Sequence, residues 1–194
     1  GKYHYLNRDE PLNKHDHIIF NLDDGKQLRY NDTRKFGRMK LVSLDNYANE
    51  LPLSKLGPEP FYADEKKLYE KLHKCNLPIK HALLDQSIIA GIGNIYANEI
   101  CFAMGLDPYT PASKLTKKSV KELIEVASNI LNEAIKQGGT TIHSFSANGI
   151  DGLFQVKLKA HLQKKCPICG GEITKEAIKG RGTYYCKKCQ KRRR

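Results

Sequence analysis

Two cysteine pairs near the C-terminus, Cys166-Pro-Ile-Cys169 and Cys186-Lys-Lys-Cys189, constrain the fold more strongly than any other part of the sequence. A C-x-x-C turn directs two thiolates at one centre, and two such turns complete a tetrahedral metal site. We therefore predict that the four cysteines bind one Zn²⁺. Because four thiolates leave no open coordination position, this ion is predicted to be structural and not catalytic.

The sixteen residues between the cysteine pairs favour a β-hairpin. Glu172–Thr174 and Thr183–Tyr185 have the composition of two short strands, which is typical of a zinc ribbon. An iron–sulfur cluster is the alternative for four cysteines, and the β pattern argues against it. Gly180-Arg181-Gly182 lies between the strands, where a guanidinium flanked by glycines can bind a phosphate bidentately. The alternative for Arg181 is an ordinary solvated side chain.

Positive charge is concentrated around this motif. Residues 156–194 carry 13 basic and 2 acidic side chains, which is a net charge of +11 out of +12 for the whole chain. The expected partner is a polyanion, because each neutralised phosphate releases condensed counterions; a solvated tail that aids solubility is the alternative. No apolar run approaches the roughly 20 residues of a membrane helix, and no secretory segment opens the chain. We therefore expect no membrane partner and a cytoplasmic protein.

The first 45 residues or so have a β pattern. His17–Leu22 and Lys26–Tyr30 flank a turn at Asp23-Asp24-Gly25, which predicts a hairpin, and Arg38–Val42 is a candidate for another strand. Two or three strands alone are marginally stable. We therefore expect this region to be part of a larger sheet or of a larger protein.

A helical pattern follows a linker at Leu56–Pro60. The fourth predicted helix has the strongest apolar periodicity; its N-cap is Thr116 or Ser119, and it ends at Gly138-Gly139. The predicted helices cover Asp64–Lys74, Ile79–Ala90, Asn94–Met104 and a segment through Val120–Ile135.

Two further segments are candidates for anion or nucleic-acid contacts. In Ala90–Tyr96, two glycines permit a tight turn before a helix, and Asn94 could cap that helix and donate to an anion. An ordinary loop between helices is the alternative. In Asn31–Arg38, Phe36 lies among basic residues and could insert between stacked bases. A core phenylalanine surrounded by exposed charges is the alternative there.

Together these segments resemble the bacterial formamidopyrimidine-DNA glycosylase family, over essentially the whole chain. The resemblance implies a base-excision repair DNA glycosylase/AP lyase that flips out oxidised purines (8-oxoguanine and FaPy), excises them and nicks the strand by β,δ-elimination. The matching motifs, in the family's order, are Tyr30–Gly37, Ile79–Gln86, Ala90–Tyr96, Gly138–Thr141 and Gly180–Cys186.

The resemblance also implies roles for individual residues. Arg34 and Phe36 would fill the gap left by the flipped nucleotide, and Lys80 would lie near the lesion and its phosphate. Asn94 and Arg181 would bind the flanking phosphates. A loop from Thr140 to Gly152, which includes Thr141, would close over the flipped base.

The sequence departs from the family pattern at the start of the chain. Family members begin with a proline whose secondary amine attacks the sugar C1′, followed by a glutamate. This sequence begins Gly1-Lys2-Tyr3-His4, so we expect no catalytic residue within it. The chain as given is predicted to bind DNA without cleaving it.

The sequence thus predicts an α+β fold with three domains. Residues 1–57 would be the C-terminal part of an N-terminal β-sandwich, residues 58–152 a helix–two-turn–helix DNA-binding domain with the lesion-capping loop, and residues 153–194 a β-hairpin zinc finger. The expected partner is double-stranded DNA with an oxidised base or an abasic site, bound by a monomer when the protein is intact, in the bacterial nucleoid. Two alternatives remain: an endonuclease VIII-type glycosylase for oxidised pyrimidines, and a zinc-ribbon DNA-binding module without enzymatic activity.

Overall fold

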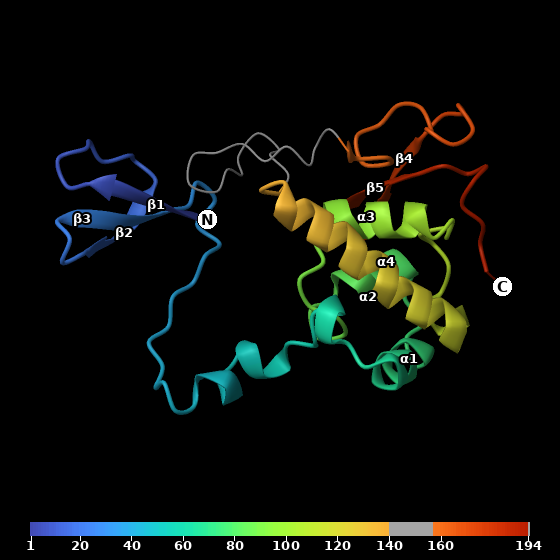
Figure 1. Cartoon of the computed structure of the whole chain (residues 1–194), viewed down its shortest axis with the longest axis horizontal. Helices are drawn as coiled ribbons and strands as arrows, with labels where there is room; N and C mark the ends of the chain where they lie inside the picture. The colour runs from blue at the N-terminus through green and yellow to red at the C-terminus, as the bar shows by residue number, and fades with distance from the viewer. Residues whose placement is uncertain (140–156, 194) are drawn as a thin grey trace. The chain divides into compact units, whose positions relative to one another are not determined.

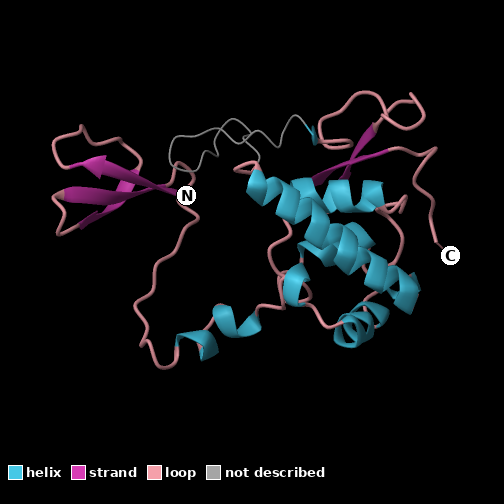
Figure 2. Cartoon of the chain, in the orientation of Figure 1, coloured by secondary structure: helices cyan, strands magenta, loops and turns pink. Residues whose placement is uncertain are grey.

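The computed structural model of the 194-residue chain describes residues 1–139 and 157–193 (Figure 1). The predicted loop that contains Thr140 and Thr141 lies outside the described residues. The chain divides into two compact units, one of Gly1–Ser43 with Ala134–Lys157 and one of Leu44–Glu133 with Leu158–Arg194. Helices and small antiparallel sheets together confirm the predicted α+β class (Figure 2).

The N-terminal unit contains a three-stranded antiparallel sheet in the order β1-β3-β2. Its strands are β1 (Lys2–Asn7), β2 (Asp16–Asn21) and β3 (Lys26–Asn31). The predicted hairpin is present, and β1 was missed. The strand predicted at Arg38–Val42 is wrong, because among the described residues this segment has no neighbouring strand to pair with.

One face of this sheet carries aromatic and aliphatic side chains. The register places Tyr3 opposite Tyr30, and Leu28 between Tyr5 and Phe20, so that these side chains share one face. Tyr3, Tyr5 and Phe20 each remain between 42% and 50% exposed. Neither hydrophobic core found among the described residues includes a residue of the sheet. Among the described residues, the sheet therefore contributes to neither core.

The second unit contains the helices. They are α1 (Glu65–His73), α2 (Ile79–Leu84), α3 (Asn94–Ala103) and α4 (Lys117–Lys136). Their apolar faces meet in one core that includes Leu72, Ile79, Leu83, Ile100, Leu106 and Leu123, each at most 1% exposed. Among the described residues, no helix is long and apolar enough to cross a membrane.

Helix α2 is shorter than the predicted Ile79–Ala90. Asp85 adopts extended backbone after Leu84, and its carboxylate accepts hydrogen bonds from the backbone N–H (2.9 Å) and hydroxyl (2.6 Å) of Ser87. Such a side-chain turn competes with continued helix. The ends of α4 agree with the prediction, because Thr116 Oγ1 accepts from the Ser119 N–H at 3.2 Å and Gly138 has a φ of 70°.

The C-terminal ribbon consists of β4 (Thr174–Ile178) and β5 (Arg181–Tyr185), joined by a turn at Lys179-Gly180. The first strand was predicted too early, at Glu172–Thr174. Both turn residues have positive φ, 45° and 75°, as a two-residue hairpin requires. Arg181 therefore opens β5 and does not lie on the turn itself.

The ribbon and the helices form one unit. Phe102 of α3 is buried in a second core with Ala160, Ile173, Cys166 and Cys186, and β5 lies beside α3 (Figure 1). The ribbon is thereby fixed against α3.

Candidate metal centre and nucleic-acid interface

The four predicted zinc ligands converge on one point. All four Sγ atoms lie within 4.8 Å of one another. Cys166 and Cys189 Sγ are separated by 3.7 Å, and Cys169 and Cys186 Sγ by 3.6 Å. Zn–S bonds of about 2.3 Å in a tetrahedron place sulfurs roughly 3.8 Å apart. The donor set therefore fits one structural Zn²⁺, which is the cofactor of this ribbon.

Backbone and side-chain hydrogen bonds hold both cysteine turns. In the first, the Cys166 carbonyl accepts from the Gly170 N–H at 2.9 Å, and Gly170 has a φ of 70°. In the second, the Gln190 carboxamide oxygen accepts from the Cys186 N–H at 2.8 Å. The same carboxamide donates to the Leu106 carbonyl at 2.9 Å. Gln190, which is 2% exposed, thus joins the metal site to the helical core.

Two asparagines of α3 cover the edge of β5 that does not pair with β4. Asn94 Nδ2 donates to the Gly182 carbonyl at 3.1 Å, and Asn98 Oδ1 accepts from the Tyr184 N–H at 3.4 Å. The asparagines are one helical turn apart and their partners are two residues apart on one strand edge, so the two spacings match. An uncovered strand edge would leave these backbone groups unpaired.

The predicted role of Asn94 as a helix cap is wrong. Gly93 occupies the N-cap position, with the extended backbone (φ −97°, ψ 177°) that a cap requires, and Asn94 is the first helical residue. Because glycine has no side chain, the first amides of α3 have no side-chain cap. Asn94 Oδ1 is buried without a hydrogen-bond partner among the described residues. The absence of a side-chain cap leaves the start of α3 with the positive potential that suits an anion.

Lys80 lies beneath this edge. Its side chain is 1% exposed, and Nζ donates to the Gly182 carbonyl at 2.7 Å and to Thr183 Oγ1 at 2.8 Å. Burial, together with a smaller effect of the nearby positive charge of Arg181, lowers the pKa of Lys80 to about 8. Arg181 itself is exposed. The structure thus brings Lys80, Asn94 and Arg181 together around one short stretch of β5.

The loop that follows β3 presents Arg34 and Phe36. The buried carboxylate of Asp32 organises it by accepting from the N–H groups of Gly37 (2.8 Å) and Arg34 (3.2 Å). These backbone hydrogen bonds hold the pKa of Asp32 below its ordinary value. Phe36 is 78% exposed, and the Arg34 guanidinium carbon lies 5.5 Å from the centre of its ring. The alternative of a core phenylalanine is therefore wrong.

Three buried residues of the site were missed by the sequence analysis. Glu99 accepts from three successive N–H groups, those of Lys159 (2.8 Å), Ala160 (3.0 Å) and His161 (2.7 Å). His161 also bonds to Asn98 at 2.7 Å, and its ring packs edge-on against Tyr184. The available signal was the polar pair Asn98-Glu99 inside an otherwise apolar helix pattern, because a buried polar pair requires partners.

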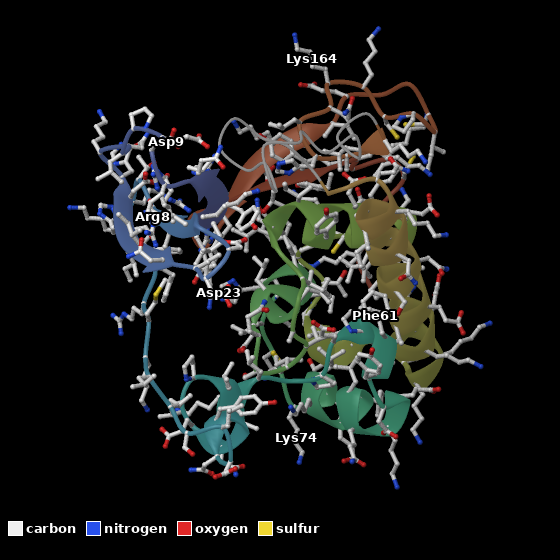
Figure 3. The ribbon with its side chains drawn as sticks, turned by 60° about the vertical axis from the view of Figure 1, so that its left-hand side comes forward. Arg8, Asp9, Asp23, Phe61, Lys74 and Lys164 are labelled. Atoms are coloured by element: carbon white, nitrogen blue, oxygen red, sulfur yellow. The ribbon has the colours of Figure 1, made fainter. Side chains whose placement is uncertain are left out.

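The ribbon carries further exposed basic side chains. Lys164 extends away from the ribbon in Figure 3. Lys165, Lys175, Lys179, Lys187 and Lys188 are also exposed. Together with Arg181 they present a cationic surface that can bind a polyanion.

Comparisons with known proteins cover all of these elements. Three protein-family profiles match the chain. They are the formamidopyrimidine-DNA glycosylase N-terminal domain (residues 1–39), the formamidopyrimidine-DNA glycosylase H2TH domain (residues 56–146) and the zinc finger found in FPG and IleRS (residues 163–192).

Curated relatives and solved structures agree with these matches. The chain is 45% identical to a formamidopyrimidine-DNA glycosylase of Bacillus licheniformis, over 99% of this chain and 72% of that protein. It is 44% identical to that of Bacillus subtilis, over 98% and 71%. Two Lactococcus lactis Fpg structures superpose with a TM-score of 0.91, one in complex with abasic-site DNA at 39% identity and a mutant with Fapy-dG DNA at 38% identity. Each covers 98% of this chain and 72% of that chain.

Proposed function

The chain belongs to the formamidopyrimidine-DNA glycosylase family, and we propose that it binds duplex DNA at oxidised purines or abasic sites for base-excision repair. The observation that carries the proposal is the convergence of Arg181, Lys80 and the start of α3 around one stretch of β5, fixed by the zinc ribbon. Arginine at a hairpin and the amides of a helix start are complementary to backbone phosphates. The geometry therefore suits a DNA strand that the protein binds through two neighbouring phosphates.

The loop around Phe36 would contribute a second kind of contact. An exposed aromatic ring beside a guanidinium can enter the base stack, where it takes the place of a flipped nucleotide. Extruding a base costs a few kcal/mol of unstacking. Arg34 and Phe36 would offset part of that cost, because they restore stacking at the gap.

The chemical step would fall to groups other than the residues described above. In the family a proline secondary amine attacks the sugar C1′, and none of the residues described above is such a nucleophile. We propose that a polypeptide of these 194 residues recognises lesion DNA and leaves both strands intact. The residues of this chain bind, orient and hold the flipped nucleotide.

The test compares binding and cleavage on matched duplexes. Gel-shift competition should show preference for duplexes with 8-oxoguanine or an abasic-site analogue over undamaged duplex, and borohydride should trap no covalent adduct on this polypeptide. Equal affinity for all duplexes would favour a zinc-ribbon module without lesion recognition. A preference for thymine glycol would favour the oxidised-pyrimidine branch, and a trapped adduct would refute the proposed lack of cleavage.

We expect Phe36→Ala to weaken lesion binding selectively. The affinity for abasic-site duplex should fall roughly tenfold, and that for undamaged duplex by less than about twofold, because only the gapped stack accepts the ring. Tyr62→Ala is the matched control, since Tyr62 is 80% exposed and lies outside the Asp32–Gly37 loop. Equal losses on both duplexes would exclude insertion of Phe36 into the stack.

A further inference from the structure

Thr183 is a buried polar residue of β5 to which the binding surface described above gives no role. Its side chain is 0% exposed. Its hydroxyl donates to the Arg181 carbonyl at 3.1 Å and accepts from Lys80 Nζ at 2.8 Å. The hydroxyl therefore connects the Lys80 ammonium on α2 to the backbone of Arg181.

The carbonyl of the next residue, Gly182, is also held by side-chain hydrogen bonds. Gly182 O accepts from Lys80 Nζ at 2.7 Å and from Asn94 Nδ2 at 3.1 Å. Three side chains from α2, α3 and β5 thus fix two successive carbonyls, those of Arg181 and Gly182. Gly182 lacks the side chain that would otherwise limit its backbone, so this stretch needs external restraint.

The restraint acts on the backbone that sets the direction of the Arg181 side chain. Arg181 is exposed and follows a turn in which both residues have positive φ. Its guanidinium leaves the ribbon in a direction set by the backbone of β5, because side-chain rotamers depend on backbone angles. A bidentate contact with a phosphate tolerates little misalignment.

We propose that Thr183 is a positioning residue, whose buried hydroxyl links Lys80 to the Arg181 backbone and so aims the Arg181 guanidinium at a DNA phosphate. This inference rests on the proposed function, since it requires that Arg181 bind a phosphate. Thr183 cannot touch DNA while it is fully buried. Any effect of its hydroxyl on phosphate binding must therefore pass through Arg181 or Lys80.

The alternative is that Thr183 only stabilises the ribbon, and the salt dependence of binding separates the two. Each phosphate contact contributes about 0.9 to the slope of log K against log salt. Arg181→Ala should lower the slope of the zinc-loaded chain by about that amount. Thr183→Val, which replaces the hydroxyl with a methyl group, should lower the slope toward the Arg181→Ala value and weaken binding about fivefold.

Two variants serve as controls. Thr183→Ser keeps the hydroxyl and should retain the wild-type slope. Tyr109→Phe removes a different ribbon hydrogen bond, the 2.7 Å bond from Tyr109 to Glu176, which pairs with Thr183 across the ribbon, and should lower thermal stability without changing the slope. Zinc content and the melting temperature identify any variant that fails to fold. If Thr183→Val fails to fold, Thr183→Ala, which also lacks the hydroxyl, takes its place.

The double variant Arg181→Ala/Thr183→Val decides the mechanism. If Thr183 acts through Arg181, the second substitution changes the slope no further. A wild-type slope for Thr183→Val, or an additional decrease in the double variant, would refute the positioning role. If Arg181→Ala leaves the wild-type slope unchanged, the proposed phosphate contact itself is refuted, which is a different result.

Discussion

Removal of zinc is expected to abolish lesion binding, with a loss of affinity of about 100-fold or more because a structural Zn²⁺ contributes roughly 10–16 kcal/mol to the folding of its site. Two of the five buried residues of the ribbon core, Cys166 and Cys186, are themselves zinc ligands. The apolar remainder is too small to fold without the metal. Unfolding the ribbon would release Arg181 and the edge of β5 that α3 holds.

The experiment pairs chelation with substitution. Cys166→Ser/Cys186→Ser removes one ligand from each cysteine pair and should lose zinc, DNA affinity and ribbon structure measured by hydrogen exchange. The helical core should persist, since its buried members come from α1–α4 and their connections. Cys75→Ser is the matched control, because Cys75 is half-buried and lies outside the metal site. Zinc-free protein that retained full affinity would contradict the structural role of the metal.

How much of the site was predictable depends on the range of the interactions involved. The zinc ligands could be predicted from local sequence, because a C-x-x-C turn positions two thiolates wherever it lies in the fold. The convergence of all four sulfurs confirms this ligand set. The long helix and its Thr116 cap follow from local periodicity in the same way. The start of β4 was misplaced because strand ends depend on the partner strand and not on composition.

The remaining features depend on contacts between distant segments. Asparagine is a residue type that is common at helix N-caps, but Gly93 occupies the N-cap position of α3. The Asn94 side chain therefore bonds to residue 182 of the ribbon. The burial of Lys80 arises from contacts more than 100 residues away along the chain, which no local pattern encodes. Glu99 is likewise explained only by the three N–H groups of residues 159–161.

The affinity for DNA should fall as the pH rises above 8. Burial lowers the pKa of Lys80 from 10.5 to about 8, so the ammonium is charged at pH 7 and mostly neutral at pH 9.5 in the free protein. A nearby phosphate favours the charged form, so binding takes up the missing proton. If the complex retains that proton, affinity is constant below pH 8 and falls about thirtyfold by pH 9.5.

The groups around Lys80 do not titrate in this pH window. Burial raises the pKa of the Cys101 thiol to about 12. It lowers the pKa of His161 to about 4. A change centred near pH 8 in this part of the molecule is therefore assigned to Lys80.

Lys80→Met is the decisive comparison, because it keeps a side chain of similar length without the ammonium. Gly182 O retains its bond from Asn94, and Thr183 retains its bond to Arg181, so the substitution leaves both carbonyls paired. Dissociation constants measured from pH 6.5 to 9.5 at constant ionic strength should then be nearly flat for the variant. A wild-type decline that persists in Lys80→Met would refute the assignment to Lys80.

Stability should change in the opposite direction over the same pH range. The pKa of Lys80 is lower in the folded than in the unfolded state, so between pH 8 and 10.5 the unfolded state binds more protons and the free energy of unfolding rises. Relative to Lys80→Met, the wild-type chain should gain up to roughly 3 kcal/mol across this window. General alkaline damage would weaken folding and binding together. Tighter folding with weaker DNA binding is therefore the signature of a buried cation that is kept at a cost in stability because it attracts phosphate.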